Sequence, residues 1–301
     1  MIKFIVIKMN TLVTTIIGIL VVFILFFYIN FNENISVFLN LSKPNHIYYY
    51  DFDGDGKKDE LTISEINNYY EIKIKTSNKD YILNCSNINF LTICPYYDLK
   101  VNILDLSRDN IPEIILSNYY NNSSQYCIFK WNGANFENIF CYNDNILGII
   151  NSNNSRTPFI LKTNFLNNNF SCNFIDNNTI KEVTANNLNI YSLDEVSKFI
   201  DLIEYPYEPT ELPDIFIPSI STDELKIFWN LDKYNYQYKF QSAYFYDNDW
   251  NDSGYPSSIL WTLSFQKTNR NNTNKPSKEI LIHITTNIDY LNHYKISSIS
   301  L

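Results

Sequence analysis

A stretch rich in aspartate and glycine decides the fold of this chain: Asp51-Phe52-Asp53-Gly54-Asp55-Gly56-Lys57-Lys58-Asp59. Carboxylates stand at positions 1, 3, 5 and 9, and Gly56 at position 6 permits the sharp turn that lets them converge. The backbone carbonyl of Lys57 at position 7 adds another oxygen. Because calcium prefers oxygen ligands, the stretch predicts a calcium site formed by Asp51, Asp53, Asp55, Lys57 and Asp59.

The segments that flank this loop predict strands. Ile47-Tyr48-Tyr49-Tyr50 precedes it and Leu61-Thr62-Ile63 follows it, and both are rich in aromatic or β-branched residues. An EF-hand would need a helix on each side and a glutamate at position 12, where this chain has Thr62. The alternative is a surface turn without metal, since aspartate and glycine are common in turns.

The loop recurs twice along the chain. The second copy begins at Asp105, 54 residues on, and offers oxygen ligands from Asp105, Ser107, Asp109, the carbonyl of Ile111, and Glu113. Asn110 replaces the glycine and tolerates a left-handed backbone. We expect weaker metal binding there, because Ser107 is a poorer ligand than aspartate. The third copy, from Asn151, keeps the spacing without any carboxylate.

The pattern Asp-x-Asp-x-Asp-Gly-x-x-Asp between two strands resembles the FG-GAP/VCBS repeat of integrin-type β-propellers and bacterial surface proteins. The resemblance implies strand-loop-strand blades stabilised by calcium. Hairpin signals such as Trp131-Asn132-Gly133-Ala134 support strands between the loops. We therefore predict a mainly β fold, with a three-unit β-propeller-like repeat domain over residues 45–187. Three blades are too few to close a ring.

The N-terminus predicts a membrane anchor. Thr11 to Ile29 is almost wholly apolar and long enough to cross a bilayer. Lys3 and Lys8 precede it, which places the N-terminus in the cytoplasm and the rest of the chain outside. We expect a cytoplasmic stub and transmembrane helix over residues 1–31 and a tether over residues 32–44. The alternative is a cleaved signal peptide, although no Ala-x-Ala-like site comes after the segment.

Residues 188–301 predict an α+β domain. Ser192 and Glu195 have the spacing of a capping box, and Val196, Phe199, Ile200 and Ile203 form one apolar helix face. Ser221 and Glu224 repeat the capping pattern. Four strand candidates come next, over residues 234–246, 258–267, 278–286 and 294–301, so helices come first and an antiparallel sheet second.

Five cysteines lie in the repeat region: Cys85, Cys94, Cys127, Cys141 and Cys172. Cys127 and Cys141 lie on the two arms of one predicted hairpin and could be cross-strand neighbours. If the arms pair with equal length, however, the two cysteines are one residue out of register. The sequence favours buried thiols over a disulfide, because free cysteine is often buried.

The sequence favours binding over catalysis. A net charge of −9 argues against nucleic acid as a partner. We expect a single-pass cell-membrane protein with calcium-stabilised β-repeats that binds or scaffolds an extracellular protein or carbohydrate. The segment from Tyr244 to Asp252 is an aromatic and acidic candidate for contact with sugars. The alternative is an extracellular or cell-wall glycan hydrolase that uses Asp247, Asp249 and Asp252, although three acids on one loop do not form a pair across a cleft.

Overall fold

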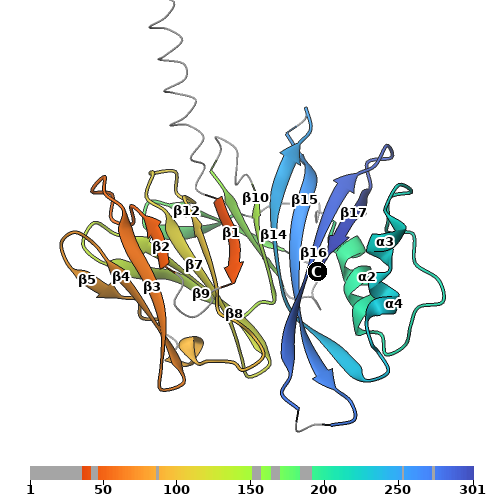
Figure 1. Cartoon of the computed structure of the whole chain (residues 1–301). Coiled ribbons are helices and arrows are strands. Elements are labelled where there is room, and N and C mark those ends of the chain that lie inside the picture. The colour runs from red at the N-terminus through yellow and green to blue at the C-terminus, as the bar shows by residue number, and fades with distance from the viewer. Residues whose placement is uncertain are drawn as a thin grey trace, which may run out of the picture. The chain divides into compact units, whose positions relative to one another are not determined.

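The computed structural model describes residues 36–41, 47–85, 88–150, 157–163, 170–183, 192–252, 254–272 and 275–301. These residues form a mainly β structure of three sheets (Figure 1), as the alternating sequence pattern predicts. None of the helices described is long and apolar enough to cross a bilayer. The predicted anchor, Thr11 to Ile29, lies outside the described residues.

The first sheet contains the aspartate-rich loop. Its order is β2-β3-β4-β5, all antiparallel, and the loop joins β2 to β3. The strands are β2 (Ile47–Tyr50), β3 (Asp59–Ile66), β4 (Tyr69–Lys75) and β5 (Asp80–Ile82). The prediction that the loop joins two strands, rather than two helices, is confirmed.

The second sheet repeats this arrangement around the second loop. Its order is β1-β6-β7-β8-β9, and the second loop joins β6 to β7. The strands are β1 (Ser36–Leu41), β6 (Lys100–Leu104), β7 (Glu113–Tyr120), β8 (Ser123–Trp131) and β9 (Phe136–Tyr142). β1 falls within residues 32–44, which we expected to be a tether, and its six residues form a strand instead. They pair with β6, whose edge would otherwise be open.

The third sheet joins the predicted third repeat to the C-terminal strands. Its order is β13-β12-β11-β10-β14-β15-β16-β17, and the contact between β10 and β14 is parallel. The strands are β10 (Ile146–Ile150), β11 (Phe159–Thr163), β12 (Ser171–Asp176), β13 (Thr179–Val183), β14 (Tyr236–Trp250), β15 (Pro256–Asn269), β16 (Lys278–Ile288) and β17 (Tyr294–Ser300). The strands on either side of the predicted boundary at residue 187 thus belong to one sheet.

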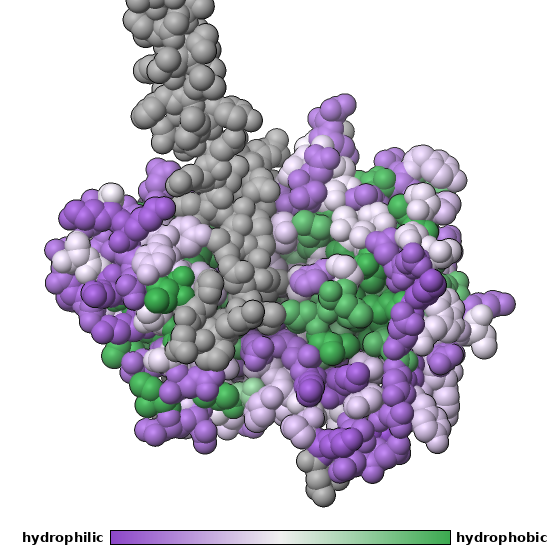
Figure 2. Space-filling view, viewed as in Figure 1, coloured by the Kyte–Doolittle hydropathy of each residue, from purple (hydrophilic) through white to green (hydrophobic). Residues whose placement is uncertain are grey.

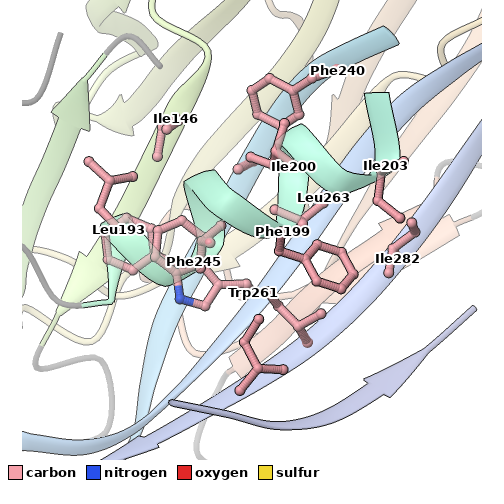
Figure 3. Packing of buried hydrophobic residues seen from close by; sticks show 14 of the residues in the cluster. Ile146, Leu193, Phe199, Ile200, Ile203, Phe240, Phe245, Trp261, Leu263 and Ile282 are labelled. Atoms are coloured by element: carbon pink, nitrogen blue, oxygen red, sulfur yellow. The ribbon is translucent and has the colours of Figure 1, made fainter. Parts of the chain in front are cut away.

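A helix covers part of this sheet. Phe199, Ile200 and Ile203 of α2 (Leu193–Glu204) pack against Leu263 and Ile282 (Figure 3), so the predicted apolar helix face is confirmed. The remaining helical elements are η1 (Ile88–Leu91), α3 (Thr222–Leu225) and α4 (Ile227–Asn230).

The capping box predicted at Ser192 is absent, whereas the one at Ser221 and Glu224 is present. The Ser192 hydroxyl instead accepts hydrogen bonds from Trp261 Nε1 and Thr286 Oγ1, each at 3.0 Å. Burial of the Trp261 indole therefore decides where the Ser192 side chain points.

A second apolar cluster lies between the second and third sheets. Ile115, Tyr126 and Ile128 belong to a cluster with Leu147 and Tyr244 of the third sheet. The Tyr126 hydroxyl also donates to the Ala243 carbonyl at 3.1 Å. Neighbouring residues of β10 and β14, such as Ile146 and Phe245, belong instead to the cluster that contains α2. The two faces of the third sheet are thus covered by different partners.

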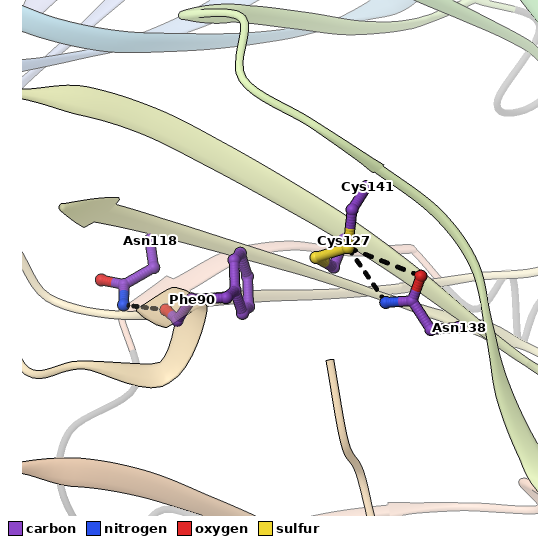
Figure 4. The surroundings of a disulfide bond; sticks show 5 residues. All are labelled: Phe90, Asn118, Cys127, Asn138 and Cys141. Carbon is purple, nitrogen blue, oxygen red and sulfur yellow. Dashed lines mark hydrogen bonds between the residues drawn. A yellow bond between two sulfur atoms is a disulfide. The ribbon is translucent and has the colours of Figure 1, made fainter. Parts of the chain in front are cut away.

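A disulfide joins Cys127 to Cys141 across β8 and β9 (Figure 4). The preference for buried thiols is wrong for this pair. A hairpin with arms of equal length would leave Cys127 and Cys141 one residue out of register. The register of β8 and β9 shifts by one residue between Ile128 and Phe129, and this irregularity places the two cysteines opposite each other. Cys94 and Cys172 are buried thiols, and Cys85 is a half-buried one.

Apolar residues reach the surface unevenly. In Figure 2 hydrophilic residues cover much of the visible face, and the broadest apolar area lies on the side of the C-terminal strands. The aspartate-rich loop is largely exposed between Gly54 and Lys58.

Candidate metal centre

The first loop brings three carboxylates together. Oxygen atoms of Asp51, Asp53 and Asp59 lie within 4.8 Å of one another. Asp51 sits at the end of β2 and Asp59 at the start of β3, so the antiparallel pairing of these strands brings the two ends of the loop together. Three carboxylates at this separation repel one another unless a cation lies among them. The cluster therefore has the donor set of a site for a hard cation.

The backbone of the loop is folded around Asp51. Its Oδ1 accepts the Gly54 N–H and its Oδ2 accepts the Gly56 N–H, both at 2.8 Å. Gly54 and Gly56 have φ angles of 76° and 82°, a left-handed conformation that glycine adopts without steric cost. The alternation of aspartate with glycine is thus a requirement of the turn as well as of the ligand set.

Asp59 carries the strongest sign of a missing partner. Its exposed fraction is 2 %, its Oδ2 accepts the Phe52 N–H at 2.8 Å, and its Oδ1 has no hydrogen-bond partner among the described residues. Burial raises the pKa of Asp59 to about 6; the backbone N–H groups of Phe52 and Asp53 oppose this rise, and the negative charges of Asp53 and Asp51 add to it. A buried carboxylate oxygen without a partner is costly, and a bound cation would satisfy it.

The fourth aspartate of the loop, Asp55, stands apart from this cluster. The Asp55 carboxylate accepts hydrogen bonds from Ser77 Oγ at 2.5 Å and from the Lys57 N–H at 2.8 Å, and these lower its pKa. Asp55 is not among the three clustered carboxylates. The Lys57 ammonium lies 3.6 Å from Asp55 Oδ2. The loop thus supplies three ligands in position, and Asp55 is held by Ser77 of the hairpin that comes after β4.

The second loop has the same backbone plan. Asp105 accepts the N–H groups of Asp109 at 3.2 Å and Asn110 at 3.1 Å, at positions 5 and 6, whereas Asp51 accepts those at positions 4 and 6 of its own loop. Glu113 Oε2 accepts the Leu106 N–H at 2.6 Å, the counterpart of the bond from Phe52 to Asp59. Asn110 has a φ of 66°, so the predicted left-handed turn without glycine is confirmed.

A lysine side chain sits among the ligands of the second loop. Lys130 Nζ lies 2.6 Å from Asp109 Oδ2, 2.7 Å from Ser107 Oγ and 2.8 Å from Glu113 Oε1. Burial alone lowers the pKa of Lys130, but its hydrogen bonds to Asp109 and Glu113 raise the value above the usual one. An ammonium thus contacts three residues of the predicted weaker metal site, which comprises Asp105, Ser107, Asp109, Ile111 and Glu113.

Sequence reasoning missed Lys130 because it looked like an ordinary residue of a strand. The register of the hairpin formed by β7 and β8 could have revealed it. β7 and β8 turn at Asn121 and Asn122, and counting outward from this turn places Glu113 opposite Lys130, one step beyond the observed pair Ile114 and Phe129. Most of the third loop, residues 151–156, lies outside the described residues.

The candidates for catalysis do not converge. Asp247 is buried, whereas Asp249 and Asp252 are exposed. Three pockets in the described part of the chain are lined by other residues. Tyr244 and Phe245 are buried in the two apolar clusters, so these two rings of the predicted sugar platform belong to the core, whereas Tyr246 and Trp250 are half-buried. His283 is exposed, and its Nδ1 lies 3.0 Å from Thr262 Oγ1 on the neighbouring strand.

Comparisons with known proteins add no family. Neither protein-family models nor curated proteins give a match to this chain. The resemblance to FG-GAP/VCBS repeats therefore stays a prediction from the loop residues.

Proposed function

We propose that this chain is a membrane-anchored, extracytoplasmic binding or scaffolding protein whose first β-unit is stabilised by one calcium ion. Asp51, Asp53 and Asp59 would hold the ion, with the Lys57 carbonyl as a further oxygen donor, and Asp55 would join them by exchanging its contact with Ser77 for the ion. The observation that carries the proposal is Asp59 Oδ1, a buried carboxylate oxygen that has no hydrogen-bond partner among the described residues and lies beside two other carboxylates. Calcium would satisfy it and neutralise its neighbours.

A β-propeller-like repeat architecture is part of the proposal. Three successive groups of strands, β2 to β5, β6 to β9 and β10 to β13, are each antiparallel and sequential. In each group the copy of the loop lies between the first strand and the second. Topology of this kind supports a common repeat unit, with the metal kept in the first copy.

The proposed compartment rests on two features. The apolar segment Thr11 to Ile29 is preceded by lysines, which favours export of the residues C-terminal to it. The bond between Cys127 and Cys141 is typical of proteins that fold in an oxidising compartment. Both favour a location where calcium is plentiful, so even a site with a dissociation constant of about 10⁻⁴ to 10⁻³ M would be filled.

Topology is tested on intact cells that express the full-length protein with a tag at each end. An antibody should reach the C-terminal tag without permeabilisation and the N-terminal tag only after it. Labelling of the N-terminal tag alone on intact cells would overturn the proposed orientation.

The rival function, glycan hydrolysis, is separated from binding by one assay. Full-length protein is incubated with cell-wall polymer and with extracellular polysaccharide, and both retention and new reducing ends are measured. Binding predicts retention without new ends. Release of reducing ends that Asp249→Asn abolishes would instead support the hydrolase, and Asp249 suits the test because its side chain is exposed.

A further inference from the structure

The two loops can be compared position by position. Position 9 is Asp59 in the first loop and Glu113 in the second, and both side chains are buried. Each accepts the N–H of the residue at position 2, Phe52 or Leu106, with one oxygen. The second oxygen distinguishes the loops: Asp59 Oδ1 has no partner among the described residues, whereas Glu113 Oε1 lies 2.8 Å from Lys130 Nζ.

The residue opposite position 9 explains this difference. Glu60 pairs with Lys75 and Ile114 pairs with Phe129, so one step further Thr76 faces Asp59 and Lys130 faces Glu113. Thr76 is short and uncharged, and its hydroxyl donates to the Lys79 carbonyl at 3.2 Å. Lys130 is long enough to reach into its loop, where its side chain is only 4 % exposed.

The contacts of Lys130 match those of a bound cation. Its three oxygen partners come from positions 3, 5 and 9, which are metal-ligand positions of the motif: Ser107, Asp109 and Glu113. An ammonium offers three hydrogen-bond donors and one positive charge. A calcium ion would need the same oxygens at about 2.3 to 2.6 Å, so it cannot share them with the ammonium.

We infer that Lys130 is a built-in cation that replaces a metal ion in the second loop, and that Lys130→Thr converts this loop into a divalent-cation site. Threonine is chosen because it is the residue at the equivalent position of the first unit. This inference rests on the proposed calcium site of the first loop, which serves as the model for the second. The experiment below separates the two, because each predicts its own change in the number of ions bound.

If Lys130 replaces a metal ion, the two loops differ in their dependence on calcium. A tethered ammonium keeps the second loop closed at any calcium concentration, whereas the first loop depends on an ion from solution. The two loops also touch, since a Cβ built on Gly54 would lie 2.6 Å from Ile111 Cδ1.

The test counts calcium ions bound to the full-length protein by equilibrium dialysis at millimolar calcium. The proposals predict one ion for wild type, two for Lys130→Thr, none for Asp53→Ala and one for the double variant. Wild type with none and Lys130→Thr with one would reject the first-loop site and keep this inference. Wild type and Lys130→Thr with one ion each would keep the first-loop site and reject this inference.

Two control variants test whether the gain of an ion depends on removing the positive charge from the second loop. Lys130→Arg keeps the positive charge and should bind the same number of ions as wild type. Asp109→Asn changes a half-exposed partner of Lys130 and should leave both the wild-type count and its calcium-dependent melting shift unchanged. A smaller count or shift in Asp109→Asn would show that the native second loop already holds metal, and would overturn the inference.

Discussion

The Lys130 ammonium lies 2.8 Å from Oε1 of Glu113, a carboxylate that is wholly buried. The equivalent carboxylate of the first unit, Asp59, is equally buried and has no lysine opposite it. One loop therefore carries its own positive charge, and the other leaves a carboxylate oxygen without a partner among the described residues. This contrast allows the two units to be tested with matched substitutions.

Neutralising position 9 should have opposite effects in the two loops. Without calcium at pH 7.5, Asp59→Asn should raise the free energy of unfolding by about 1 to 3 kcal/mol, because it removes a buried, uncompensated charge. Glu113→Gln should lower it by about 3 kcal/mol, because it leaves the Lys130 ammonium without its buried partner. Chemical denaturation of the wild-type protein and both variants in the presence of chelator measures these free energies of unfolding. Equal destabilisation by the two substitutions would contradict the assigned charge balance.

Stability without calcium should depend on pH through Asp59. Its pKa in the folded chain is about 6, above that of an unfolded aspartate, so the folded chain binds the proton more tightly. Stability should therefore fall as pH rises from about 4 to about 6. Calcium needs the ionised carboxylate, so its stabilising effect should be small at pH 5 and complete above about pH 7. A calcium effect of equal size at pH 5 and pH 7.5 would contradict this assignment, and Asp59→Asn should lack the dependence.

The disulfide should contribute to stability and leave three free thiols. Cys127 and Cys141 are separated by 14 residues, and a loop of that length corresponds to about 3 kcal/mol. The Cys127→Ala/Cys141→Ala variant should unfold more easily by about this amount, with Cys85→Ala as a control. Thiol titration of the denatured, unreduced protein should find three thiols per chain, and five would show that the bond does not form.

The junction of β10 and β14 should be sensitive to a single methyl group. Gly148 pairs with Phe245, and a Cβ at Gly148 would lie 1.9 Å from Phe245 Cζ. Gly148→Ala should destabilise the chain by about 1 to 3 kcal/mol through overpacking. Phe245→Leu in the same chain should recover part of the loss, because the two residues are in contact. Simple additivity of the two substitutions would contradict the contact.

Local pattern predicted the strands well. The four strands expected over residues 234–246, 258–267, 278–286 and 294–301 are present as β14 to β17, and the first two loops lie between strands as expected. The pairings between distant segments could not be predicted, because period-2 alternation says which face a residue occupies and not which strand lies beside it. The antiparallel contact of β1 with β6 and the parallel contact of β10 with β14 are of this kind.

The candidate site was predicted in part. Spacing predicted the cluster of Asp51, Asp53 and Asp59, since the turn geometry is local. It did not predict that Ser77 would hold Asp55, or that Lys130 would enter the second loop. Both contacts come from neighbouring hairpins, and hydrogen bonds of this kind depend on register rather than on the motif.

The central claim is that Asp51, Asp53 and Asp59 hold calcium, and a thermal melt of the full-length protein tests it most directly. Calcium at ten times its dissociation constant should add about 1.4 kcal/mol to the free energy of unfolding, relative to chelator. The melting temperature should then rise by about 3 to 5 °C. Asp53→Ala should abolish this rise, whereas Asp109→Asn should retain it. Superimposable melts of the wild-type protein in calcium and in chelator would contradict the claim, and the first loop would then be a turn without metal.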